Sequence, residues 1–191
     1  VLEAAASVAA SSVTTCSWLA GGGARADLWE VFDEGHLSTY GWSRGWEVAE
    51  PLRIQNIDVE PYRERVDRIL DRSQPRLIVV NGPSEIWNSS WCQISRENNA
   101  SRQKMKRIRG YLQEVDRIVD KQTAAGRNFL LQLPLYRQFV NTKEMQKMQT
   151  KPEVLDGIGW SAVKYNNGAN SVKRRVWWVT DSGPIAQSIR K

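Results

Sequence analysis

The sequence predicts an α/β fold in which helices cover both faces of a mostly parallel β-sheet. Short apolar runs alternate along the chain with longer amphipathic segments, an order that is typical of parallel sheets. Residues 75–81 contain a continuous β-branched run, as expected for a strand that is buried on both faces. Residues 101–125 instead repeat apolar side chains at helical spacing, which predicts a long amphipathic helix.

The remaining elements follow from the same two patterns. We expect further strands at residues 27–32, 46–50, 129–133 and 176–180, and helices at 36–44, 59–72 and 184–190. Gly45 and Gly126 are suited to end the helices that precede them, because glycine adopts a left-handed conformation without strain.

Composition sets limits on the class of protein. A chain of 191 residues suits one domain, which we place at residues 27–191, after an Ala/Ser/Gly-rich tail or linker at 1–26. That tail contains Glu3 and little arginine, which favours a linker over a transit peptide. Two cysteines and one histidine are too few for a structural zinc site, and no apolar run is long enough to span a membrane. The net charge of +6 favours a polyanionic partner.

Four predicted loops at the carboxyl ends of strands carry the candidate site, since ligands of parallel sheets bind at this edge. Residues 30–38, Glu50, residues 82–87 and residues 132–136 occur there in order. Together they resemble the cytosine-C5 methyltransferase type of Rossmann domain, and more closely the methyltransferase-like domains of retroelement polyproteins such as those of dinoflagellates. The resemblance covers about residues 27–148 and implies a class I methyltransferase-like, Rossmann-like fold.

The resemblance also implies roles for individual residues. Phe32, Gly35 and Glu50 match the positions that hold S-adenosylmethionine in the family, and Glu50 matches the acidic residue that binds ribose hydroxyls. Ser84 and Gln132 match the family's catalytic cysteine and glutamate. These are the residues that S-adenosylmethionine and a methyl acceptor would contact if the loop after Phe32 is functional.

Departures from the family pattern argue against catalysis. Asp33 and Glu34 stand where small residues are expected, and two carboxylates crowd the carboxylate of the cofactor. A serine hydroxyl is a far weaker nucleophile than a thiolate, and Ser84 has no histidine near it in sequence. The amide of Gln132 forms hydrogen bonds but delivers no proton to the base. We therefore expect no bound cofactor and no methyl transfer.

Three other catalytic interpretations have less support in the sequence. Cys92 is a possible displaced nucleophile, but a small apolar filler is the simpler interpretation. The sequence at 81–84 has part of the Asn-Pro-Pro-aromatic loop of amino-methyltransferases, without its second proline and its aromatic residue. A hydrolase pair of Ser84 and His36 lacks the Gly-x-Ser-x-Gly turn that such enzymes use.

A basic segment precedes and enters the long helix. Its candidate nucleic-acid-binding residues are Arg102, Lys104, Lys106, Arg107 and Arg109, with Trp87 and Trp91 as stacking platforms. The competing interpretation is the solvated face of an amphipathic helix. Trp177 and Trp178 are adjacent in a predicted strand and point to opposite faces, so we expect one of them to be exposed on a partner surface.

The leading hypothesis is an inactive methyltransferase-like domain derived from a retroelement, which serves as a structural or RNA-binding component of a larger intracellular assembly, for example in mitochondria or another organelle. Its partners would be nucleic acid and protein subunits. The alternatives are an active S-adenosylmethionine-dependent methyltransferase on nucleic acid and a plain nucleic-acid-binding module.

Overall fold

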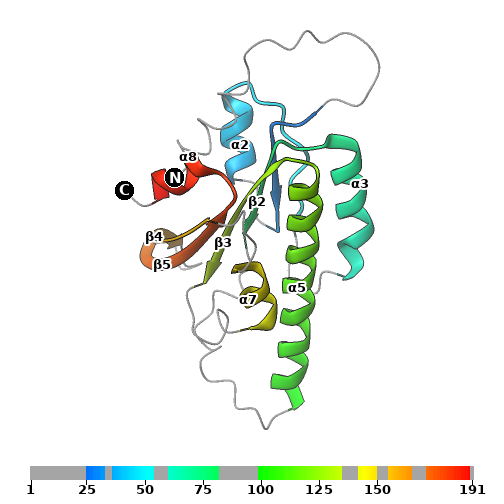
Figure 1. The fold of residues 1–191 in the computed structure, drawn as a ribbon, viewed down its shortest axis with the longest axis vertical. Helices are drawn as coiled ribbons and strands as arrows, with labels where there is room; N and C mark the ends of the chain where they lie inside the picture. The colour runs from blue at the N-terminus through cyan, green and yellow to red at the C-terminus, as the bar shows by residue number, and fades with distance from the viewer. Residues whose placement is uncertain are drawn as a thin grey trace.

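The computed structural model describes residues 25–32, 36–53, 60–81, 99–134, 142–149, 155–164 and 171–189. In chain order its elements are β1 (Leu28–Val31), α2 (His36–Ser43), η1 (Glu60–Tyr62), α3 (Arg63–Ser73), β2 (Leu77–Asn81), α5 (Asn99–Ala124), β3 (Asn128–Pro134), α7 (Lys143–Gln149), β4 (Leu155–Lys164), β5 (Ser171–Thr180) and α8 (Gly183–Ile189) (Figure 1). The tail predicted at 1–26 lies outside the described residues, apart from its last two.

The sheet has five strands in the order β1-β2-β3-β5-β4. The pairs β1–β2 and β2–β3 are parallel, whereas β5 runs antiparallel to β3 and β4 antiparallel to β5. The predicted strand at 46–50 is wrong as a continuous strand, because only Val48 and Leu52 form single parallel bridges to β1. Pro51 lies between these two positions, and proline has no N–H group with which to continue a ladder.

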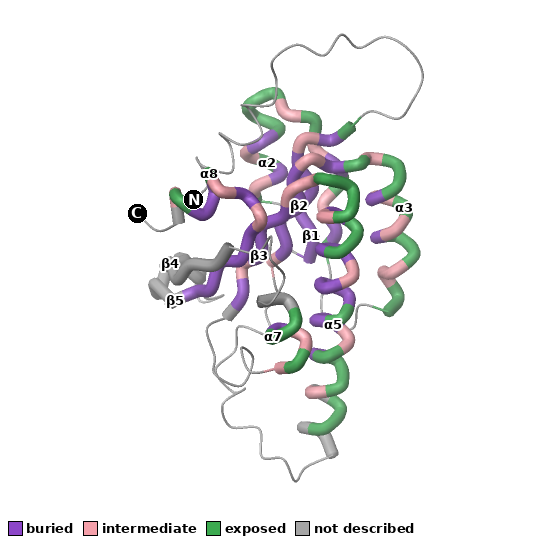
Figure 2. The backbone as a smooth tube through the Cα atoms, viewed as in Figure 1, coloured by how far each residue is buried: buried purple, intermediate pink, exposed green. Residues whose placement is uncertain are grey.

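Helices cover both faces of the sheet, which confirms the predicted α/β class. On one face, α3, α5 and α7 pack over a core that includes Trp29, Ile78, Phe129 and Leu131. On the other face, Ile185 of α8 packs with Leu28, Leu77, Val79, Leu130 and Val176, and Leu37 of α2 packs against the same cluster. Figure 2 shows β1, β2 and most of β3 as the buried centre between these two layers.

The long helix α5 has the buried stripe that its sequence predicts. Ile108, Leu112, Val115, Ile118 and Val119 are all fully buried, and Met105 packs partly buried against the same core. Gly126 follows the helix with φ of 65°, in the left-handed region that glycine tolerates. Among the described side chains of α5, full burial begins at Ile108.

The expectation that Trp177 or Trp178 is exposed is wrong. Their relative exposures are only 3% and 8%. They do point to opposite faces, since Trp177 joins the core beneath α5 and Trp178 joins the core with Ile185 of α8. Because both faces of β5 are covered, neither indole forms a partner surface.

Within the part of the chain that the structure describes, we find no helix that is both long and apolar enough to cross a membrane.

Candidate functional site at the carboxyl edge of the sheet

Between β1 and β2, the chain reverses the direction in which it adds strands across the sheet. After β1 it passes to one side, where Val48 and Leu52 bridge to β1, and it then crosses to β2 on the other side. In open α/β sheets, ligands bind outside the carboxyl ends of the strands at such a switch point. The candidate site therefore lies where β1 ends near Phe32 and β2 ends at Asn81.

Phe32 occupies this position in a strained backbone conformation. Its φ is +66°, a region that bulky side chains rarely adopt and that recurs at functional sites. Its ring is 2% exposed and lies 5.5 Å from the ring of Tyr111 on α5. The Tyr111 hydroxyl donates a hydrogen bond of 3.5 Å to the carbonyl oxygen of Asn81. The two aromatic side chains thus tie the ends of β1 and β2 to the long helix.

Glu30 places a fully buried carboxylate beside the same edge. Its oxygens accept hydrogen bonds from the backbone N–H groups of Leu37 at 3.3 Å and Ser38 at 2.9 Å. These are first-turn N–H groups of α2, which have no partner within the helix. In Rossmann-like sheets, such a helix start often binds phosphate. Here Glu30 occupies two of those N–H groups, so its negative charge opposes an anion at this point.

Glu50 lies on the surface next to α3. Its carboxylate is 74% exposed and forms an ion pair of 2.6 Å with Arg65, and its carbonyl oxygen accepts a hydrogen bond from the Trp29 indole. Exposed pairs of this kind stabilise a protein by about 0–1 kcal/mol at most. A ribose hydroxyl would have to compete with Arg65 for this carboxylate.

The register of the sheet brings Gln132 to the same edge. Gln132 on β3 pairs with Asn81, the last residue of β2, and its side chain is partly buried. The loop that carries Ser84 begins directly after Asn81. Ser84 itself, together with Gly35, Trp87 and Trp91, lies outside the described residues, so their predicted roles stay predictions.

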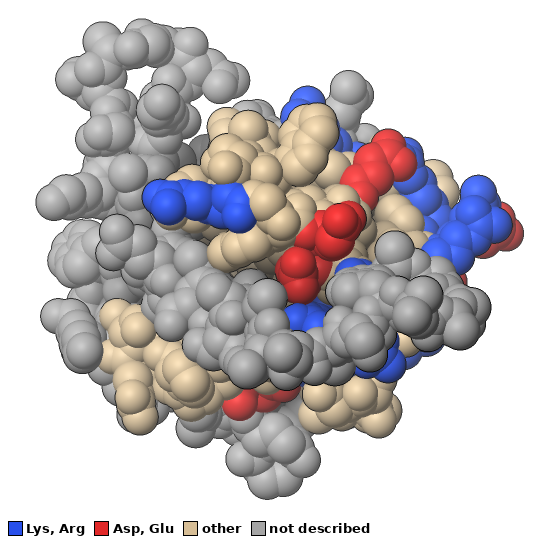
Figure 3. All heavy atoms as spheres, turned by 90° about the horizontal axis from the view of Figure 1, so that it is seen from above, with Lys and Arg blue, Asp and Glu red and all other residues tan. Residues whose placement is uncertain are grey.

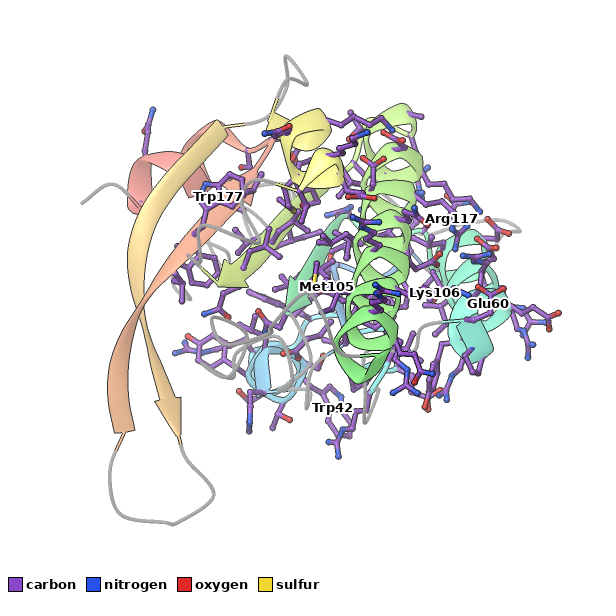
Figure 4. The ribbon with its side chains drawn as sticks, turned by 90° about the horizontal axis from the view of Figure 1, so that it is seen from below. Trp42, Glu60, Met105, Lys106, Arg117 and Trp177 are labelled. Atoms are coloured by element: carbon purple, nitrogen blue, oxygen red, sulfur yellow. The ribbon has the colours of Figure 1, made fainter. Side chains whose placement is uncertain are left out.

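The amino-terminal half of α5 reaches this edge with a group of exposed cations. Arg102, Lys106, Arg107 and Arg109 are exposed, and none of them forms an ion pair among the described residues. The side chain of Lys104 lies outside the described set. The helix starts at the end of the molecule toward which the arrows of β1, β2 and β3 point (Figure 1). Seen from below, Met105 points toward the sheet and Lys106 away from it (Figure 4).

In the carboxyl-terminal half of α5, by contrast, the basic side chains form ion pairs with carboxylates. The fully buried carboxylate of Glu114 pairs with Arg117 at 2.5 Å and with Arg63 of α3 at 3.2 Å. Asp67 of α3 pairs with both Arg117 and Lys121. Arg117 and Lys121 therefore attach α5 to α3 and are not available to a ligand.

A second contact of the same kind attaches α7. Lys147 pairs with Asp116 at 2.6 Å and lies 4.0 Å from Asp120, and these contacts raise the pKa of Lys147.

On the end of the molecule opposite the candidate site, acidic side chains lie among the basic ones (Figure 3). The cations at the start of α5, which form no ion pair within the described part of the chain, therefore differ from the charge pattern seen there.

The ion pairs of Asp67 predict a pH dependence of stability. Burial raises the pKa of Asp67, but hydrogen bonds and charges from Arg117 and Lys121 outweigh it and lower the pKa below its ordinary value of 3.8. A lowered pKa gives stability that is complete above 3.8 and is lost as the pH falls toward the folded-state pKa. We expect Asp67→Asn to be less stable than the wild type at neutral pH, and the difference to shrink in acid. Urea unfolding across this range measures it, and a difference that is independent of pH would contradict the assignment.

Sequence reasoning missed two residues of this edge. Glu30 is an acidic residue inside an otherwise apolar strand, and that signal marks a buried carboxylate with a dedicated partner. Tyr111 lies on the buried stripe of α5 and resembles an ordinary core residue in sequence. Only the fold shows that its hydroxyl meets the end of β2.

Comparison with known proteins gives little further information. No protein-family model and no curated protein matches this chain. Among solved structures, the chain is similar to a precorrin-8w decarboxylase of Methanobacterium thermoautotrophicum, with 12% sequence identity and a TM-score of 0.37. The match covers 83% of this chain and 82% of that chain. A likeness at this level carries no argument about function.

Proposed function

We propose that this chain is a methyltransferase-like domain that does not transfer methyl groups and instead binds RNA as a component of a larger assembly. The observation that supports this most is the set of exposed cations at the carboxyl edge of the sheet that form no ion pair among the described residues. Phosphate groups of nucleic acids are bound mainly by lysine and arginine, with release of counterions. Arg102 and Arg109 have no carboxylate partner among the described residues, whereas Arg117 has two.

The chemistry of the matched positions supports binding without catalysis. Gln132 offers an amide at the edge where the family has an acid, and an amide neither gives nor takes a proton at neutral pH. Ser84 replaces the family's thiol. The Glu30 carboxylate at the start of α2 opposes an anion there, which leaves Arg102, Lys106 and Arg109 of α5 as the anion-binding part of this edge. The location in an RNA-containing assembly of an organelle is part of this proposal and rests on the sequence pattern.

A matched pair of double variants tests the proposal. Arg102→Ala/Arg109→Ala removes two exposed arginines from the start of α5, and Arg68→Ala/Arg72→Ala removes two exposed arginines from α3. Both variants lower the net charge by the same amount. Losing two phosphate contacts should weaken RNA binding roughly 10-fold or more at moderate salt, whereas the α3 variant should bind almost as the wild type does.

The measurement is fluorescence anisotropy with a labelled RNA oligonucleotide. Equal losses in the two variants would mean that net charge, and not a site on α5, attracts the RNA. No binding by the wild type would contradict the proposal as a whole.

A further inference from the structure

Three of the exposed cations on α5 form a single file along the helix. Arg102, Lys106 and Arg109 are separated by four and three positions, and residues at this spacing share one face of a helix. With a rise of 1.5 Å per residue, the file extends about 10 Å along the axis. All three side chains are exposed.

Arg107 has the same charge but lies outside this file. Each residue turns a helix by about 100°, so Arg107 points well away from its neighbour Lys106. Two turns later, the same face carries Glu114, which contacts Arg63 of α3. Arg107 therefore faces the side of α5 on which α3 lies and provides an internal control within the same basic segment.

Arg102, the first residue of the file, occupies an unfavourable position in the free protein. The positive end of the helix dipole acts within the first turn of a helix and disfavours cations there. The first turn of α5 contains no acidic residue to offset this effect. A phosphate beside Arg102 would relieve the repulsion, so this cation is suited to an anionic ligand and poorly suited to stabilising the helix.

We infer that Arg102, Lys106 and Arg109 contact successive phosphates of one nucleic-acid strand, an inference that rests on the proposed function and specifies its ligand. One line of cations complements one line of phosphates. A duplex presents two lines, separated by grooves that are about 6 and about 12 Å wide. Contacts to phosphates do not read bases, so the site accepts a single strand of any sequence.

The test measures how the affinity for a labelled single-stranded polyuridine RNA depends on salt concentration. Each phosphate contact on a single strand contributes about −0.7 to the slope of log K against log salt. Arg102→Ala, Lys106→Ala and Arg109→Ala should each make the slope shallower by about 0.7, whereas Arg107→Ala should leave it unchanged. Circular dichroism checks folding, and Arg102→Gln, Lys106→Gln or Arg109→Gln replaces the alanine variant of the same residue if that variant does not fold.

The outcomes separate this inference from the proposed function. If Arg107→Ala changes the slope as much as the three file variants do, a diffuse electrostatic field attracts the RNA. That result would overturn the contacts inferred for the file, while RNA binding itself would stand. Tighter binding of an RNA duplex than of the single strand would also overturn it. A wild type that binds neither RNA would overturn both the file and the proposed function.

Discussion

Replacing Arg117 with leucine should destabilise the folded protein by about 3 kcal/mol, because it leaves a buried carboxylate with one of its two partners. The Glu114 side chain is 0% exposed, whereas Arg63, the partner that would remain, is 43% exposed and lies 3.2 Å away. The hydrogen bonds that Arg117 donates to Glu114, and then to Asp67, raise the pKa of Arg117 against the effect of burial, so this guanidinium stays charged. Chemical denaturation at neutral pH measures the loss directly.

Two further variants isolate the cause. Lys121→Met removes a cation from the same helix, but its pair with Asp67 is 41% exposed on the lysine side, and the expected loss is below about 1 kcal/mol. The double variant Glu114→Leu/Arg117→Leu should recover most of the stability, because no buried charge remains. If Arg117→Leu lowers the stability no more than Lys121→Met does, Arg117 is not needed to compensate the buried charge of Glu114.

Replacing Glu30 with alanine should cost about 2–3 kcal/mol of stability. The substitution leaves the N–H groups of Leu37 and Ser38 without their acceptor in a buried place, and it opens a small cavity under α2. Thermal and urea unfolding of the purified variant measure this cost.

Glu64→Ala is the matched control for Glu30, because it removes an exposed glutamate from the first turn of α3. Surface substitutions of this kind change stability by about 0.5 kcal/mol or less. If the two variants are equally stable, Glu30 does not fix the start of α2. Its carboxylate would then not hold a fixed negative charge against an anionic ligand at that helix start.

The parts of the fold that sequence predicts well are those in which one physical signal dominates. The apolar run of β2 and the periodic stripes of α3 and α5 identify these elements, since burial alone requires their patterns. β4 is not predicted, because two glycines, an aspartate and a serine interrupt its apolar positions. α7 is also missed, because seven mostly polar residues give too short a pattern.

The errors have a common physical origin in tertiary contacts. The exposure predicted for Trp177 or Trp178 treats β5 as a strand with one free face, but α8 covers the second face. The predicted strand at 46–50 has the right neighbour, β1, but forms only two bridges around Pro51. Local patterns describe which residues are apolar, and they do not show which helix covers a given face.

The features of the candidate site also differ in how well the sequence predicts them. Sequence order identifies Phe32 and Gln132 as ends of parallel strands, and the fold places both at the carboxyl edge. Sequence also identifies the basic segment, but it does not separate cations with carboxylate partners from those without. That separation depends on α3, which supplies Arg63 and Asp67 to the second half of α5 and leaves its first half free of ion pairs among the described residues.

We propose that this edge binds RNA and does not methylate it. One filter-binding measurement tests both parts, with RNA that carries one label and S-adenosylmethionine that carries a second label on its methyl group. We expect the protein to retain the RNA on the filter and the RNA to acquire no methyl label. Transfer of the methyl label to the RNA would overturn the proposal and establish an active methyltransferase, and RNA that passes through the filter would show that the edge does not bind it.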